Sequence, residues 1–170
     1  MRHIEAFSTE QDRESWFCRT GKHEFAIYLA GGISDIDDWQ DQFISHFKQL
    51  QSDTLMKALY LKNLTIINPR RNHFNDKRSE IKKQIMWEHA HAKAADALVF
   101  YFPADSHCSI SLFQYGKYLT SGKKIFVGIE KDHLKSLDIF AHTRIEKPDQ
   151  NINYSITDLI EEVQNYIEGS

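Results

Sequence analysis

The sequence predicts a doubly wound α/β fold, with helices on both faces of a mostly parallel sheet of about five strands. Four short segments, 25–30, 64–67, 97–102 and 124–129, are almost entirely apolar, as strands buried on both faces are. Between them lie segments whose apolar residues recur at helical spacing. Alternation of these two patterns along one chain is typical of parallel sheets.

Each strand is expected to stop at residues that interrupt extended structure. Gly31-Gly32 follows the first apolar segment, Asn68-Pro69 follows the second and Pro103 follows the third. A further short strand is expected at 4–7, and the fifth strand is placed near 143–145. Ligands of such flavodoxin-like sheets bind beyond the carboxyl ends of the strands, so the chemistry is expected there.

Two helices are expected before the third apolar segment. The first covers about 36–51, with Ser34 or Asp35 capping its first turn. Its apolar stripe consists of Trp39, Phe43, Phe47 and Leu50. The second covers about 79–94 with Ser79 as its N-cap. Its inner face is expected to consist of Ile81, Ile85, Ala92 and Ala95.

Two further helices are expected, one over about 110–119 and one that begins at Ser155. At the start of the second of these helices, Ser155-x-x-Asp158 resembles a capping box. The expected buried stripe of this helix consists of Leu159, Ile160, Val163 and Ile167. The segment 129–154 is charged and weakly periodic, so a subunit contact, a lid and plain surface all stay open for it.

Length and composition indicate a single globular domain over 1–170, with 1–23 as an N-terminal extension. The 170 residues are 41% hydrophobic and 26% charged, and the mean hydropathy is −0.52. No apolar run approaches the roughly 20 residues of a membrane-spanning helix, and no long apolar secretory signal starts the chain. Two cysteines, Cys18 and Cys108, are too few for a disulfide framework, so a cytoplasmic protein without a membrane partner is expected.

The charge balance favours small-molecule partners over a nucleic-acid polymer. There are 21 basic and 24 acidic residues, a net charge of −3, whereas proteins that bind a phosphate backbone need a basic surplus or stripe. The one basic cluster, Arg70-Arg71 with 77–78 and 82–83 nearby, is either a local anion contact or a solvated helix flank.

Two polar segments at strand ends and one carboxylate in the middle of a helix could carry chemistry. Gly31-Gly32-Ile33-Ser34 is either a tight turn or a cradle in which the backbone approaches a ligand. In Asn68-Pro69-Arg70-Arg71 the arginines suit phosphate or carboxylate, or else they are exposed. Glu88 lies next to the apolar face of its helix, so it is either a half-buried pairing partner or a ligand to hydroxyl groups.

The sequence gives little support for a metal site, a serine hydrolase or a cysteine nucleophile. His89 and His91 point to different sides of a helix and cannot chelate one ion, and we expect no metal and no cofactor. There is no GxSxG nucleophile elbow. Cys108 beside His107 formally permits a thiolate nucleophile.

Several segments, taken in order, resemble the nucleoside 2-deoxyribosyltransferase-like family over most of the chain. They are Ile27-Tyr28-Leu29-Ala30-Gly31-Gly32-Ile33, Asp38-Trp39-Gln40, Asn68-Pro69-Arg70-Arg71, Gln84-Ile85-x-Trp87-Glu88, Ala95-Asp96, Phe102-Pro103 and Ser109-Ile110-Ser111-Leu112-Phe113-Gln114-Tyr115-Gly116. The resemblance implies cleavage of the N-glycosidic bond of a nucleoside or nucleotide, or deoxyribosyl transfer through a glycosyl ester of a glutamate. It also implies a homodimer or higher homo-oligomer.

The resemblance places the catalytic pair at Glu88, which would bind sugar hydroxyls, and at position 114. The expected substrate-binding residues are Gly31, Gly32, Ser34, Trp39, Asn68, Arg70, Arg71, Cys108 and Ser109. The family's nucleophilic glutamate stands two residues before a glycine, where this chain has Gln114. An amide is a poor nucleophile, and losing a covalent nucleophile can cost several powers of ten in rate.

Three explanations for Gln114 stay open. It is an engineered substitution, it marks a natural member that has become a binding protein, or Glu88 or Asp105 acts as base for a bound water. The preferred function is N-glycosidic cleavage or transfer. The alternatives are a catalytically silent nucleotide sensor and a hydrolase of NAD or an ADP-ribose derivative.

Overall fold

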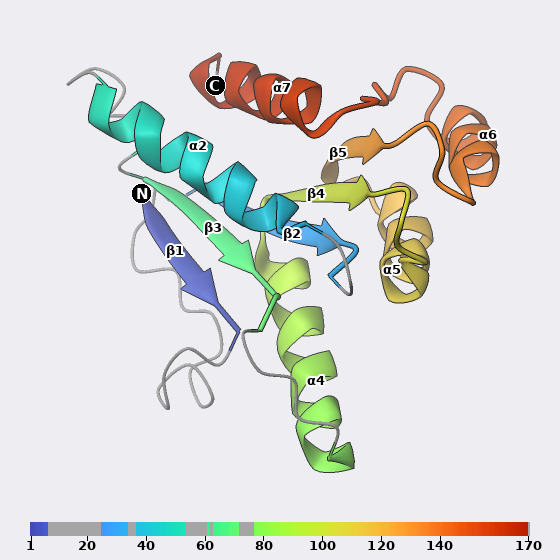
Figure 1. Cartoon of the computed structure of the whole chain (residues 1–170), viewed down its shortest axis with the longest axis horizontal. Coiled ribbons are helices and arrows are strands. Elements are labelled where there is room, and N and C mark those ends of the chain that lie inside the picture. Colours follow the sequence, from blue (N-terminus) through green and yellow to red (C-terminus); the bar gives the residue numbers. More distant parts are fainter. Residues whose placement is uncertain (7–24, 34–36, 54–60, 62, 72–76, 170) are drawn as a thin grey trace.

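The sheet is parallel throughout and has five strands (Figure 1). The computed structural model describes residues 1–6, 25–33, 37–53, 61, 63–71 and 77–169. The strands run in the order β1-β3-β2-β4-β5. Their bounds are Arg2–Glu5 for β1, Phe25–Gly31 for β2, Leu64–Asn68 for β3, Ala97–Phe102 for β4 and Lys124–Ile129 for β5.

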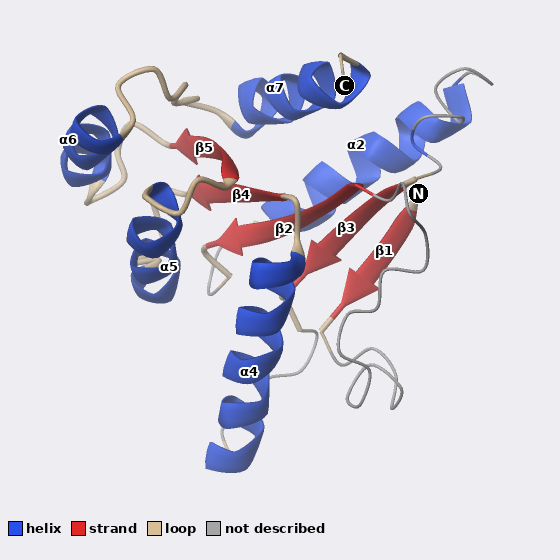
Figure 2. Ribbon diagram, turned by 180° about the vertical axis from the view of Figure 1, so that it is seen from behind, coloured by secondary structure: helices blue, strands red, loops and turns tan. Residues whose placement is uncertain are grey.

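Helices cover both faces of this sheet, which confirms the doubly wound α/β prediction (Figure 2). One face carries α2 (Trp39–Asp53) and α7 (Ile156–Glu168), whose apolar side chains share one buried cluster. The other face carries α4 (Arg78–Ala94) and α5 (Ser109–Leu119), with α6 (Ser136–Glu146) beside α5. None of the helices in these described ranges is long and apolar enough to cross a membrane.

The two faces have separate cores because successive side chains of a strand point to opposite sides. Ile27 and Leu29 of β2 pack with the α2 and α7 cluster, whereas Tyr28 packs with the α4 and α5 cluster. The chain leaves β2 through α2 to reach β3, then crosses back through α4 to β4. The connections after β2 and β3 therefore lie on opposite faces, and this divergence marks the topological switch point.

The predicted position of the fifth strand is wrong. Residues 143–145 belong to α6, where the Thr143 hydroxyl lies 2.6 Å from that of Tyr115 in α5. This buried tertiary contact outweighs the local preference of a β-branched segment for extended structure. The fifth strand is instead β1, which pairs with β3 at the sheet edge and starts two residues before the predicted 4–7. Phe7 itself lies outside the described residues.

The predicted stripe of α2 is confirmed, since Trp39, Phe43, Phe47 and Leu50 are all buried. Its proposed caps, Ser34 and Asp35, lie outside the described residues. The first turn is capped by Asp38, whose carboxylate accepts a hydrogen bond from the Asp41 amide at 2.9 Å.

In α7 the predicted cap is confirmed, because the Ser155 hydroxyl accepts from the Asp158 amide at 3.1 Å. Of the predicted stripe, Leu159, Ile160 and Val163 are buried, and Ile167 packs partly buried against them.

The predicted inner face of α4 is wrong in its first half. Ile85 is 60% exposed and Ile81 is also exposed, whereas Trp87, His91 and Ala92 are buried. Lys77, rather than Ser79, stands at the N-cap and makes no side-chain cap. The first half of α4 instead turns polar side chains inward, and these belong to the candidate site.

Candidate functional site

The end of β2 is joined to helices on both faces of the sheet. The Gly32 carbonyl accepts hydrogen bonds from the Trp39 indole at 2.9 Å and the Gln40 amide at 3.3 Å, both on α2. The Gly31 carbonyl accepts from the Ser111 hydroxyl of α5 at 2.9 Å. A Cβ at Gly31 would collide with the Tyr101 carbonyl and the Trp39 ring, so this close approach requires glycine. Ser34, predicted to join this turn, lies outside the described residues.

Each oxygen of the Glu88 carboxylate accepts a hydrogen bond from a glutamine side-chain amide. The Gln84 amide donates to Oε1 at 2.5 Å, and the Gln114 amide of α5 donates to Oε2 at 3.4 Å. Arg71, which follows β3, donates through Nε to the Gln84 carbonyl. The structure therefore brings together the two residues predicted to be catalytic, from different helices, and adds Gln84 to them.

The environment of Glu88 raises the pKa of its carboxyl group above the ordinary value. Burial is the largest cause, because it disfavours the charged form. The hydrogen bond from Gln84, the positive charge of Arg71 and the hydrogen bond from Gln114 lower the pKa and offset part of this effect. A carboxylate with a raised pKa is a stronger proton acceptor, which suits a general base.

The neighbouring arginines face different sides of the site. The Arg70 guanidinium pairs with Asp38 at 3.1 Å and donates to Gln40 at 3.3 Å, toward α2. Arg71 faces α4 instead, through Gln84. The Asn68 side chain accepts from the Arg70 amide at 3.0 Å and fixes the turn between them.

Cys108 and Ser109 stand at the start of α5. Cys108 is buried, and its φ of 47° lies in the left-handed region, which costs a residue with a Cβ roughly 1 kcal/mol. Burial raises the pKa of its thiol, while the nearby Ser106 side chain and Gly32 amide lower it. The net rise favours the thiol over the nucleophilic thiolate, and the His107 side chain is exposed.

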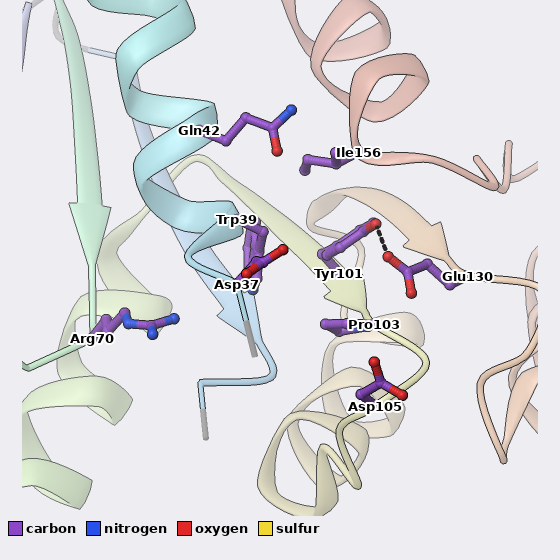
Figure 3. Close-up of a pocket in the computed structure, with 9 residues that line it drawn as sticks. All are labelled: Asp37, Trp39, Gln42, Arg70, Tyr101, Pro103, Asp105, Glu130 and Ile156. Carbon is purple, nitrogen blue, oxygen red and sulfur yellow. Dashed lines mark hydrogen bonds between the residues drawn. The ribbon is translucent and has the colours of Figure 1, made fainter. Parts of the chain in front are cut away.

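A cavity of about 670 Å³ lies at the carboxyl ends of β4 and β5, on the side of α2 and α7 (Figure 3). Its lining residues are Asp37, Trp39, Gln42, Arg70, Tyr101, Pro103, Asp105, Glu130 and Ile156. Trp39 and Arg70 are thus the two predicted substrate-binding residues that line it. Glu88 and Gln114 do not line it, so the cavity and the Glu88 network are separate parts of the sheet's carboxyl edge.

Most residues of this cavity were not predicted from the sequence, and Tyr101 and Glu130 are the two of them that bind each other. The Tyr101 hydroxyl donates to Glu130 at 2.6 Å (Figure 3). The Ala104 amide donates to the other Glu130 oxygen at 2.7 Å. Glu130 follows β5 directly, and this position at a strand end was a usable signal. Over the part of the chain that the structure describes, no three histidine, cysteine, aspartate or glutamate side chains gather as a metal site requires.

The fold defines the class: an open parallel α/β sheet, in which small ligands generally bind at the carboxyl edge of the strands. The sequence profile of a family described as nucleoside 2-deoxyribosyltransferase-like matches residues 24–133. The chain therefore belongs to the nucleoside 2-deoxyribosyltransferase-like family. The match runs from β2 through β5 and includes Glu88 and Gln114. No curated protein matches the chain.

Family membership supports a function related to glycosyl transfer on a nucleoside. The half-buried Glu88 carboxylate is compatible with that chemistry, because proton transfer and binding of sugar hydroxyls both call for a fixed carboxylate.

Proposed function

We propose that the protein cleaves the N-glycosidic bond of a nucleoside or nucleotide with water as the attacking group, and that Glu88 is the base that activates this water. The observation that carries the proposal is the Glu88 carboxylate, held on both oxygens by amides and with its pKa raised by burial. Such a group is held in one orientation, and its raised pKa makes it a stronger proton acceptor than an ordinary carboxylate.

The reaction balances without a covalent intermediate. As the bond between C1′ and the base nitrogen breaks, water attacks C1′ and gives a proton to Glu88. That proton then passes to the departing base, so the products are the free sugar and the neutral base. A carboxylate next to the reacting centre also stabilises the positive charge that develops on the sugar.

In this proposal Gln114 positions Glu88 and the water and does not attack the sugar. Its amide nitrogen is directed at Glu88, which leaves its oxygen to accept a hydrogen bond from water or a sugar hydroxyl. The substrate would lie along the carboxyl edge, in contact with residues from the ends of several strands. The proposed substrate-binding set remains Gly31, Gly32, Ser34, Trp39, Asn68, Arg70, Arg71, Cys108 and Ser109.

The test is an assay of base release by liquid chromatography. Wild type, Glu88→Gln and Gln114→Glu are incubated with a panel of deoxynucleosides, ribonucleosides, their monophosphates and NAD. We expect release by the wild type on at least one substrate and loss of at least a hundredfold in Glu88→Gln, the usual contribution of a general base. Absence of release by both wild type and Gln114→Glu across the panel would remove the enzymatic proposal. Release from NAD alone would identify the NAD-hydrolase alternative.

Gln114 itself favours a second candidate, a binding protein without turnover. The amide at the family's nucleophile position preserves the shape of the site while removing its covalent chemistry. This candidate predicts binding by calorimetry and a raised melting temperature with the same panel, but no release of base. No thermal shift with any panel member would count against it.

Self-association is a third part of the proposal and is supported by exposed apolar side chains beside the Glu88 network. Ile85 on α4, and Ile110 and Phe113 on α5, are 60%, 67% and 75% exposed. Phe113 is adjacent in sequence to Gln114, so a second copy seated there would lie close to the site. Light scattering after size exclusion measures the mass, and a monomer at all concentrations would contradict this part.

A further inference from the structure

The half-buried side chain of Gln84 makes three hydrogen bonds that connect three parts of the site. Its amide nitrogen donates to Glu88 at 2.5 Å and to the Pro69 carbonyl at 3.1 Å. Its carbonyl oxygen accepts from Nε of Arg71. Both ends of the amide are used, and this pattern fixes which end is nitrogen and which is oxygen.

This arrangement ties Glu88 to the segment that follows β3. Gln84 lies one helical turn before Glu88 on α4, so the two side chains are neighbours on one helix face. Pro69 belongs to the turn after β3 and anchors the amide from outside the helix. A glutamate on a helix has three rotatable side-chain bonds, and a donor anchored in this way limits the directions its carboxylate can take.

We propose that Gln84 is a positioning residue that holds the Glu88 carboxylate in one orientation and links it to the Arg71 guanidinium. The inference rests on the proposed function, in which Glu88 is the base. Gln84 acts on the reaction through Glu88 and is not a catalytic residue. Nothing in the family resemblance assigned it a role.

The charged and titratable groups facing Glu88 come from several elements. Arg71 after β3 lowers the pKa of Glu88, and Tyr28 of β2 lies close enough for Glu88 to raise the pKa of its phenol. Glu80 on α4 acts on Arg71. Of the groups that favour the charged form of Glu88, the hydrogen bond from Gln84 has the largest effect. Removing it therefore raises the pKa of Glu88.

The first experiment is an NMR titration that needs no turnover. Glutamate side-chain carboxyl groups are labelled with ¹³C, and the Glu88 signal is the one missing from Glu88→Gln. We expect Glu88 to titrate at a higher pH in Gln84→Met than in wild type, because methionine keeps the length and removes the amide. Gln49→Met, an exposed position on α2, is the matched control and should leave the Glu88 titration unchanged.

A second readout uses the unaltered chain, which keeps the inference testable if Gln84→Met does not fold. The side-chain amide signals of Gln84 should shift with the same midpoint as the Glu88 carboxyl group, and this shift should vanish in Glu88→Gln. A Gln84 signal that does not follow Glu88 overturns the inference. A Glu88 titration that is unchanged in Gln84→Met, or moved to lower pH, also overturns it.

The kinetic readout separates positioning from binding. In Gln84→Met we expect kcat for base release to fall roughly tenfold, the effect of losing a hydrogen bond to a charged group, with KM little changed. The acid limb of the pH profile should move to higher pH together with the Glu88 titration. A raised KM at unchanged kcat would overturn the inference. If the wild type shows no turnover, the proposed function fails, and the two NMR readouts still decide the role of Gln84.

Discussion

The contact between Gln114 and Glu88 makes the substitution Gln114→Glu a sharp physical test. It places a second carboxylate where an amide nitrogen now lies 3.4 Å from a Glu88 oxygen. Two unit charges at 4 Å repel by about 4 kcal/mol at an effective dielectric constant of about 20. Because half-buried side chains can move apart, we expect about half of this, roughly 2 kcal/mol, as lost unfolding free energy.

The loss depends on pH in a direction that can be worked out. The carboxylate pair keeps a proton to avoid repulsion, so in the folded variant one carboxyl group titrates above its unfolded value of about 4.3. A raised pKa in the folded state gives stability that is present at low pH and lost as the pH rises through that pKa. The variant should therefore match wild type near pH 4 and fall behind it by pH 8.

The assay is thermal unfolding across this pH range. About 2 kcal/mol corresponds to a decrease of about 4–8 °C in Tm for a chain of this size. Gln114→Met removes the hydrogen bond without adding charge; it raises the pKa of Glu88 only through the lost bond, so its deficit relative to wild type should grow with pH far less than that of Gln114→Glu. Asn165→Asp, at an exposed position of α7 one turn from Glu161 and Glu168, repeats the change from amide to carboxylate in water and should cost only a few tenths of a kcal/mol. A pH-independent deficit in Gln114→Glu would refute the reasoning.

Other substitutions test separate features. Glu88→Gln should gain stability relative to wild type as the pH rises above the ordinary carboxyl range, because the raised pKa of Glu88 makes the wild type lose stability there. A difference in unfolding free energy between the two proteins that stays the same at all pH values would contradict this. Gly31→Ala should cost more than about 2 kcal/mol in unfolding free energy, since its Cβ meets backbone. A Cβ at Gly116, inside α5, would meet open space, so Gly116→Ala should gain about 0.5–1 kcal/mol in unfolding free energy. Equal effects of the two alanine substitutions in urea unfolding would show that the close contacts at Gly31 are misassigned. Ser155→Ala should lose about 1 kcal/mol, and no change in Tm would mean that the cap contributes nothing.

The periodicity of apolar residues was enough to predict the central strands and most helices. Their patterns reflect burial on one side for helices and on two sides for strands, and both are visible in the sequence. The helix α6 was missed because its large apolar residues are mostly exposed and show no stripe. Leu137 is 77% exposed and Ile145 is 71% exposed. Its inward contact is made by Thr143 with Tyr115, a pairing between segments distant in sequence that no local pattern indicates.

The sequence was enough to predict that Glu88 and Gln114 lie together, but it did not predict their hydrogen bonds. Glu88 and Gln114 were placed together by the family resemblance, and Glu88 itself lies within a helix, twenty residues after the end of β3. The link through Gln84 depends on side-chain rotamers, which the sequence does not specify. The pairing of Arg70 with Asp38 was also out of reach, because it depends on the two connections that diverge from β2 and β3.

The hydrogen bonds at the carboxyl end of β2 have a consequence for ligand binding. The Gly31 carbonyl accepts a hydrogen bond from Ser111 on one face of the sheet, and the Gly32 carbonyl accepts one from Trp39 on the other. The carboxyl end of β2 is therefore fixed in position. A molecule that lands against it meets a surface ordered in advance, and little entropy is lost there on docking. Any adaptation to ligands of different shape would then fall to side chains that are not held in this way.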